Sequence, residues 1–157
     1  MADFNKAIEK TLINEGGYVN DPQDRGGETN FGISKRSYPN VDIKNLTVAG
    51  AKEIYKRDYW DRIRGDEIQS QRVAFSLFDT AVNMGVRTAS KLIQQCVGTH
   101  PDGKIGNITL AAVNKEDEEK LLLRFTLAKV ARYTYLAKTR ATNRRYLLGW
   151  ISRALEA

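Results

Sequence analysis

The spacing of apolar residues predicts helices along most of the chain. Phe4, Ile8 and Leu12 recur every three or four positions after Asp3, which can cap a first helix that Gly16-Gly17 ends. Similar spacing between turn residues predicts further helices over residues 47–60, 70–85, 88–98, 108–113, 116–137 and 142–155.

The stretch from Tyr18 to Ile33 has a different pattern. Its helical period is lost, and the turn signals "NDPQD" and "RGG" favour short strands joined by turns. The sequence therefore predicts an α+β protein, mainly α-helical, with a small β-hairpin ribbon near residues 18–33. The 157 residues suffice for a single domain.

Glu15 stands out at the end of the first predicted helix. It continues the stripe of Phe4, Ile8 and Thr11, so we expect its side chain to lie on the buried face. Burial and the negative end of the helix dipole would both raise the pKa of its carboxyl group. A carboxylic acid that is protonated near neutral pH can serve as a general acid, whereas the ordinary alternative is a solvated surface residue.

The ribbon carries possible partners for such an acid. Hydrolysis of a glycosidic bond requires a proton donor on one side and a carboxylate or positioned water on the other. Asp24 and Thr29 follow Glu15 in the ribbon and could position that water, although Asp24 could equally cap a turn. Glu28 is a third candidate, with a solvent-facing strand position as its alternative.

At this point the residues resemble a known family. The segments "EGGYVNDPQDRGGETNFGIS", "EIYKRDYW", "LFDTAVNMG" and "DGKIGNITL" are similar, in this order, to glycoside hydrolase family 108, the phage-type endolysins that act as N-acetylmuramidases. Residues 1–90 resemble the catalytic part, and residues 91–157 resemble the peptidoglycan-binding region that usually follows it. Phage lysozymes resemble the chain more loosely, through a glutamate, an aspartate and a threonine. Glu15 and Asp24 fit their spacing, whereas Thr29 comes one position earlier here than their threonine.

The resemblance implies a two-lobed, lysozyme-like fold and cleavage of the β-1,4 bond between N-acetylmuramic acid and N-acetylglucosamine. Its catalytic glutamate corresponds to Glu15. For substrate binding we expect Tyr18 and Asn30 in the ribbon, Trp60 after the second main helix, and Asn83, which could instead satisfy the backbone. For Asp79, one turn before Asn83, a structural role is favoured.

The distribution of charge and the single Cys and His limit the kinds of partner and cofactor that we expect. The last 38 residues hold nine Lys/Arg and one Glu, which favours an anionic partner such as cell wall, lipid headgroups or nucleic acid. No nucleic-acid-reading motif is present, so we expect peptidoglycan as the partner, with anionic envelope surfaces contacted by the basic C-terminal helices. One Cys and one His argue against a disulfide and a zinc site, and we expect no metal or cofactor and a monomer.

The expected role is that of an endolysin. The sequence shows neither a signal peptide nor an apolar run of membrane-spanning length. We therefore expect the protein in the host cytoplasm until its release to the periplasm and cell wall. The alternatives are a non-catalytic wall-binding or structural protein, a helical nucleic-acid binder, and a lytic transglycosylase.

Overall fold

The computed structural model describes residues 1–21 and 27–157. Within these residues the chain forms α-helices α1 (Phe4–Glu15), α2 (Val48–Tyr55), α3 (Gln71–Met84), α4 (Val86–Cys96), α5 (Asn107–Lys115), α6 (Glu118–Thr139) and α7 (Leu147–Glu156). Shorter turns of helix are η1 (Lys56–Trp60), η2 (Gly65–Glu67) and η3 (Ala141–Tyr146), and the strands are β1 (Val19–Asn20), β2 (Glu28–Asn30) and β3 (Ile33–Ser34).

The predicted helix starts are fixed by side-chain caps. Asp3 accepts a hydrogen bond from the backbone N–H of Asn5, and Thr47 accepts one from Gly50. Ser70 caps α3 through Val73, and Asp117 caps α6 through Lys120. The predicted helix over residues 47–60 begins as expected but continues as a π-helical turn over its last five residues, η1.

The ribbon is a three-stranded antiparallel sheet in the order β1-β2-β3. Val19 pairs with Thr29, and Thr29 pairs in turn with Ser34. The β2–β3 turn passes through Phe31 and Gly32, which both have positive φ. The predicted ribbon is thus confirmed, with a third short strand added.

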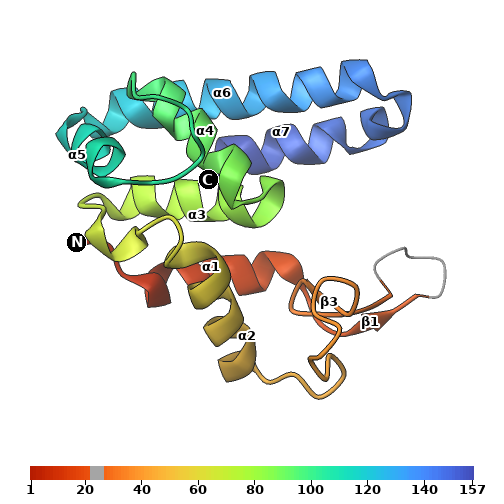
Figure 1. Ribbon diagram of the computed structural model, residues 1–157. Helices are drawn as coiled ribbons and strands as arrows, with labels where there is room; N and C mark the ends of the chain where they lie inside the picture. The colour runs from red at the N-terminus through yellow and green to blue at the C-terminus, as the bar shows by residue number, and fades with distance from the viewer. Residues whose placement is uncertain (22–26) are drawn as a thin grey trace.

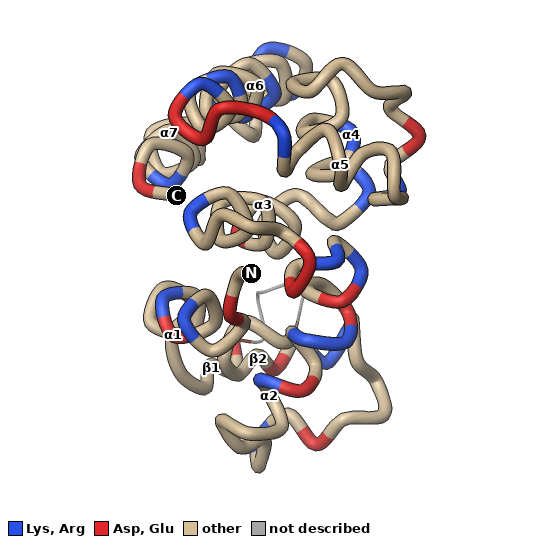
Figure 2. The backbone as a smooth tube through the Cα atoms, turned by 90° about the vertical axis from the view of Figure 1, so that its left-hand side faces the viewer, with Lys and Arg blue, Asp and Glu red and all other residues tan. Residues whose placement is uncertain are grey.

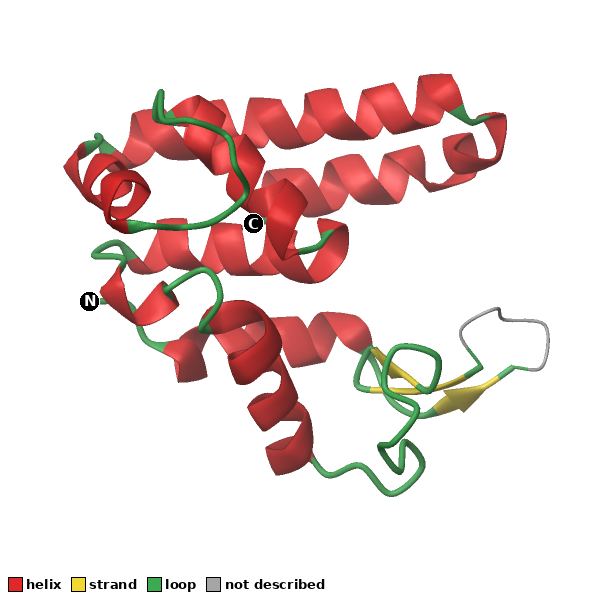
Figure 3. Cartoon of the chain, in the orientation of Figure 1, coloured by secondary structure: helices red, strands yellow, loops and turns green. Residues whose placement is uncertain are grey.

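The elements lie in two lobes that meet at α3 (Figures 1 and 3). One lobe contains α1, α2 and the sheet, and the other contains α4 to α7, with α6 and α7 side by side as an antiparallel pair. Helix α3 is buried along most of its length because it packs against both α1 and the second lobe. This mainly helical, lysozyme-like α+β fold agrees with the fold class predicted from the sequence.

An aromatic cluster fills the core between α1, η1 and α3. Trp60 lies 5.6 Å from both Phe4 and Phe78, measured between ring centroids, and its side chain is completely buried. Its indole Nε1 donates to Asp66, and a Cβ at Gly65 would come within 2.2 Å of the ring, so the indole is fully enclosed. The expectation that Trp60 contacts substrate is therefore wrong, because an indole with no exposed surface cannot stack on a sugar ring.

Charge is distributed unevenly over the fold. Figure 2 shows Lys and Arg repeated along α6, with acidic residues gathered at its first turn. Acidic residues at a helix start and basic residues at its end both complement the helix dipole. Among the described residues, no helix has the length and apolar character needed to cross a bilayer.

Candidate active site

Glu15 is the last residue of α1, where Gly16 adopts a φ of 75° and turns the chain towards the sheet. One turn earlier, Thr11 is fully buried, and the Glu15 side chain is 21% exposed. The stripe predicted from the sequence therefore continues to Glu15, with the carboxyl group at the margin of the core. This placement leaves one side of the carboxylate accessible and the other in contact with protein.

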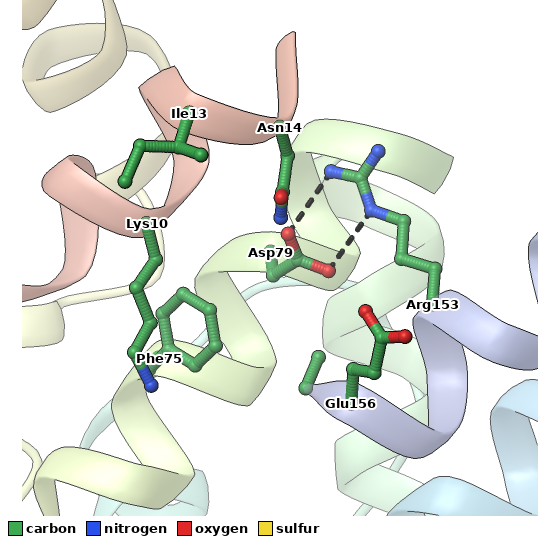
Figure 4. A pocket seen from close by; sticks show the side chains of 8 residues that line it. Lys10, Ile13, Asn14, Phe75, Asp79, Arg153 and Glu156 are labelled. Atoms are coloured by element: carbon green, nitrogen blue, oxygen red, sulfur yellow. Dashed lines mark hydrogen bonds and ion pairs between the residues drawn. The ribbon is translucent and has the colours of Figure 1, made fainter.

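The protein contact comes from α7. Arg153 Nη2 donates to Glu15 Oε1 at 3.0 Å and to Asp79 Oδ1 at 2.9 Å, while its Nε donates to Asp79 Oδ2 at 3.1 Å. One guanidinium thus joins three helices, α1, α3 and α7. The fork on Asp79 is visible in Figure 4.

The electrostatics of this triad follow from burial and pairing. Asp79 is 4% exposed, so its charge depends on the guanidinium for compensation. Burial alone would lower the pKa of Arg153, but the two carboxylates outweigh it and raise that pKa above its ordinary value. Because Asp79 offsets the charge of Arg153, Glu15 faces a nearly neutral ion pair and not an isolated cation. The sequence analysis assigned Asp79 a structural role, and the ion pair supplies one.

Gly32 and Tyr55 enclose Glu15 from the side of the sheet. A Cβ at Gly32 would lie 2.6 Å from the Tyr55 hydroxyl and 2.8 Å from Glu15 Oε2, so only glycine leaves room here. Tyr55 donates to the backbone carbonyl of Phe31 at 2.7 Å, which holds the β2–β3 turn in place. Burial, followed by the charge of Glu15, raises the pKa of Tyr55 above its ordinary value, so this hydroxyl remains a donor.

A hollow of about 200 Å³ lies on the other side of Arg153 (Figure 4). Its lining includes Asn14, Asp79 and Glu156, together with the Lys10 ammonium group, which lies 4.9 Å from the centroid of the Phe75 ring. This hollow lies beside the ion pair, and Glu15 is not among the residues that line it.

A second buried cation lies close to this triad. Lys129 of α6 is 2% exposed and donates from Nζ to Ser76 Oγ at 3.2 Å. Burial lowers its pKa to about 8, against the opposing attraction of Asp79. This burial could not be predicted from the sequence, because Lys129 belongs to a helix that carries several other Lys and Arg residues.

The ribbon residues expected at the site have different surroundings. Tyr18 is exposed, and its hydroxyl donates to Glu28 Oε1 at 2.8 Å. Thr29 is partly buried and donates to the Gly27 carbonyl at 3.3 Å. Asp24 lies outside the described residues.

Asn30 is a correction to the sequence analysis. Its side chain is buried and donates to the backbone carbonyls of Ile43 and Leu46, at 3.1 and 3.4 Å. Buried amides require such partners, and the loop after β3 supplies them. Asn30 therefore fixes this loop to the sheet and does not face a ligand. Asn83, by contrast, is partly exposed at the end of α3 and donates to the Tyr133 hydroxyl.

Arg153 is the residue that sequence reasoning missed. It was counted among the basic residues of the last quarter, which were expected to face an anionic surface. The available signal was Asp79, a carboxylate on an otherwise apolar helix that needed a buried partner. The sequence does not identify which of the many Lys and Arg residues pairs with Asp79.

Fold and site together define the class of protein: a lysozyme-like α+β protein with a carboxylate held at the end of its first helix. Comparison with known proteins agrees with this class. The family model described as "Glycosyl hydrolase 108" matches residues 8–85, and the one described as "Predicted Peptidoglycan domain" matches residues 88–155.

A solved structure gives a match over nearly the whole chain. The structure titled "Structure of Brucella abortus SagA" is 34% identical, with a TM-score of 0.82, and the match covers 98% of this chain and 90% of that one. No curated protein sequence matches. The chain belongs to glycosyl hydrolase family 108. Its family and its second, peptidoglycan-domain segment together identify it as a glycoside hydrolase that acts on peptidoglycan.

Proposed function

We propose that the protein is an N-acetylmuramidase that hydrolyses the β-1,4 bond between N-acetylmuramic acid and N-acetylglucosamine. Glu15 donates a proton to the leaving sugar oxygen, and Asp24 and Thr29 position the attacking water. The observation that carries this proposal is the placement of Glu15, which is partly shielded at the end of α1 and fixed between Arg153 and the β2–β3 turn. A general acid needs such a fixed position within reach of the scissile oxygen.

The ion pair beside Glu15 is compatible with proton donation. A free guanidinium would stabilise the carboxylate and hinder its protonation. Here Asp79 binds the same guanidinium through two hydrogen bonds, so the pair carries little net charge. Arg153 can then orient the Glu15 carboxyl group through a single hydrogen bond.

Replacement of Glu15 by Gln tests the assignment. We expect Glu15→Gln to lower the release of reducing ends from purified peptidoglycan by about 10²-fold or more, the usual contribution of a general acid. Glu9→Gln, at an exposed position of the same helix, is the matched control and should retain most of the activity. Near wild-type turnover by Glu15→Gln, with normal stability, would exclude Glu15 as the acid.

The products distinguish the remaining mechanisms. Attack by water with inversion gives the α-anomer at the new reducing end, and it requires carboxyl groups about 6.5–9.5 Å apart, against about 5 Å for retention. Proton NMR of the initial products reports the anomer. Anhydro sugars in a mass spectrum would instead identify a lytic transglycosylase, and binding without any cleavage would identify a wall-binding protein.

We further propose the endolysin role that the family resemblance implies. The protein would stay in the host cytoplasm until the inner membrane is permeabilised, and would then reach the cell wall as a monomer and cause lysis. Expression alone should leave the density of a bacterial culture unchanged, and permeabilisation with chloroform should cause rapid clearing. Clearing before permeabilisation would contradict this route.

The basic C-terminal helices are proposed to contact anionic envelope surfaces. Lys138, Arg140 and Arg144 are exposed near the α6–α7 connection, and the exposed Leu127 and Tyr135 lie on α6. Deletion of residues 138–157 would be a poor test, because it also removes Arg153 from the site. Replacing the three exposed cations by Glu should weaken binding to anionic vesicles and leave the cleavage of purified peptidoglycan intact. Unchanged vesicle binding would contradict the proposal.

A further inference from the structure

A hollow of about 210 Å³ lies in the second lobe, where the end of α3 meets α4, α6 and α7. Its lining combines aromatic and aliphatic side chains with a few polar groups, which is typical of ligand sites. The residues that matter here are Asn83, Thr88, Arg132, Tyr133, Leu136 and Trp150.

The aromatic wall of this hollow is rigid. The Trp150 ring stacks on Tyr133 with centroids 5.1 Å apart, and on Tyr146 with centroids 5.8 Å apart. Tyr133 is buried, and its hydroxyl accepts a hydrogen bond from the amide nitrogen of Asn83. Tyr133 and Trp150 thus line the hollow with stacked rings, and Tyr146 supports Trp150 from outside it, so that little side-chain freedom is lost on binding.

Besides the Asn83–Tyr133 pair, three polar groups of the hollow have no protein partner among the residues that the structure describes. The indole N–H of Trp150, the Thr88 hydroxyl and the side-chain oxygen of Asn83 make no hydrogen bond there. Trp60 shows the contrast, since its buried indole N–H donates to Asp66. Trp150 is partly exposed, so its N–H is available to a ligand.

The charge of the hollow is positive. Arg132 forms no ion pair within the described part of the chain, and its guanidinium lies 5.9 Å from the centroid of the Tyr135 ring. No Asp or Glu belongs to the lining. A guanidinium without a carboxylate partner, beside an apolar floor, fits a ligand that carries its own carboxylate.

The hollow is also close to the candidate active site. Trp150 precedes Arg153 by three residues on α7, and Asn83 follows Asp79 by four on α3. One helical turn corresponds to about 5 Å along each axis, and the Asp79–Arg153 ion pair joins the two helices at that point. A polymer bound at Glu15 therefore needs to extend only a short distance to reach Trp150.

We propose that this hollow binds the acidic stem peptide of peptidoglycan, attached to the muramic acid next to the cleaved bond. The stem begins with a lactyl group and alanine, whose methyl groups suit the floor of Tyr133, Leu136 and Trp150. Its amides can pair with Asn83, Thr88 and the Trp150 indole, and the carboxylate that follows pairs with Arg132. This inference rests on the proposed muramidase function and specifies which part of the substrate the second family segment recognises.

The two tryptophans provide a direct test. Two-dimensional ¹⁵N–¹H NMR of the whole protein shows one indole signal each for Trp60 and Trp150, and Trp150→Phe assigns them. Titration with the disaccharide-peptide that a muramidase releases should shift the Trp150 signal in a saturable manner and leave the Trp60 signal in place. Chitotetraose, which lacks a stem, should not reproduce the shift.

Charge variants complete the test. Arg132→Gln should weaken binding of the disaccharide-peptide by about tenfold or more, as expected for the loss of a charge-assisted contact, whereas Lys138→Gln on the same helix should not. An unmoved Trp150 signal at millimolar ligand, an equal shift with chitotetraose, or unchanged affinity of Arg132→Gln would each overturn the inference. Binding of the disaccharide-peptide in this titration does not require Glu15. Failure of the muramidase proposal is therefore recognised by a different result, namely that Glu15→Gln still cleaves the wall.

Discussion

Arg153 Nη2 lies 3.0 Å from Glu15 Oε1, although 138 positions separate the two residues in the sequence. The same guanidinium forks onto the buried Asp79. Because α7 belongs to the segment that matches the peptidoglycan domain, that segment contributes a side chain to the surroundings of Glu15, which lies in the segment that matches the glycosyl hydrolase model. The ion pair therefore has both a structural and a functional consequence, and the two can be separated by mutation.

The structural consequence concerns stability. Arg153→Met leaves the carboxylate of Asp79 buried without its partner, so we expect the free energy of unfolding to fall by about 3–5 kcal/mol. The double variant Asp79→Asn with Arg153→Met should recover part of this loss. Chemical denaturation measures both effects, with the exposed Lys138→Met as control. A single variant as stable as the wild type would show that the ion pair contributes nothing.

The functional consequence concerns wall cleavage. Arg153 divides its hydrogen bonds between Asp79 and Glu15, so in Asp79→Asn the guanidinium loses its second carboxylate and its position beside Glu15 is no longer fixed from two sides. We therefore expect Asp79→Asn to cleave the wall more slowly at a temperature where it remains folded. Rates of wall cleavage, compared with those of Glu9→Gln on the exposed face of α1, measure the loss. An unchanged rate in a less stable protein would indicate a purely structural role for Asp79.

Gly32 provides a test of how tightly Glu15 is held. Gly32→Ala and Gly27→Ala both place a side chain at positive φ, with an expected cost of about 1–2 kcal/mol each. Only at Gly32 would the new Cβ also collide with Glu15 and the Tyr55 hydroxyl, since nothing lies within 4 Å at Gly27. We expect Gly32→Ala alone to lose most of its wall-cleaving activity at a temperature where both variants are folded. Equal activities would contradict the close enclosure of Glu15.

Lys129 predicts a rise of stability in mildly alkaline solution. Its pKa is about 8 in the folded protein, below the ordinary value of 10.5, so the unfolded chain binds more protons between these limits. Below pH 8 the folded protein carries the full free-energy cost of burying the charge of Lys129, and this cost is removed as the pH rises towards 10.5. Relative to Lys129→Met, the wild type should therefore gain up to about 3 kcal/mol across this window. A constant difference from pH 7 to 10 would contradict the shift. Tyr55 and Tyr133 also have raised pKa values, but they are present in both proteins and cancel in the comparison.

The sequence predicted those features that depend on local periodicity and turn chemistry. The helices, their caps, the ribbon and the position of Glu15 at the edge of the buried stripe all follow from residues close to one another in the chain. The features it missed depend on long-range packing. Arg153 and Lys129 belong to helices with many similar cations, and only the fold selects which of them are buried.

The two tryptophans illustrate the same limit. From the sequence, Trp60 is expected at the substrate, whereas Trp150 is one of several aromatic residues in the basic C-terminal helices. In the structure Trp60 is fully enclosed with its indole N–H paired, and Trp150 is partly exposed with its N–H available. The sequence of an amphipathic helix does not show which edge of an aromatic ring will be covered, because the packing of neighbouring elements determines this coverage.

The meeting of the two family segments at Gly85, between α3 and α4, has a consequence for protein engineering. Chimaeras joined there would exchange the guanidinium beside Glu15 together with the hollow around Trp150. A recipient without a matching arginine would retain Asp79 as an unneutralised charge in its interior. A chimaera joined at this position therefore has to take residues 79 and 153 from the same parent protein.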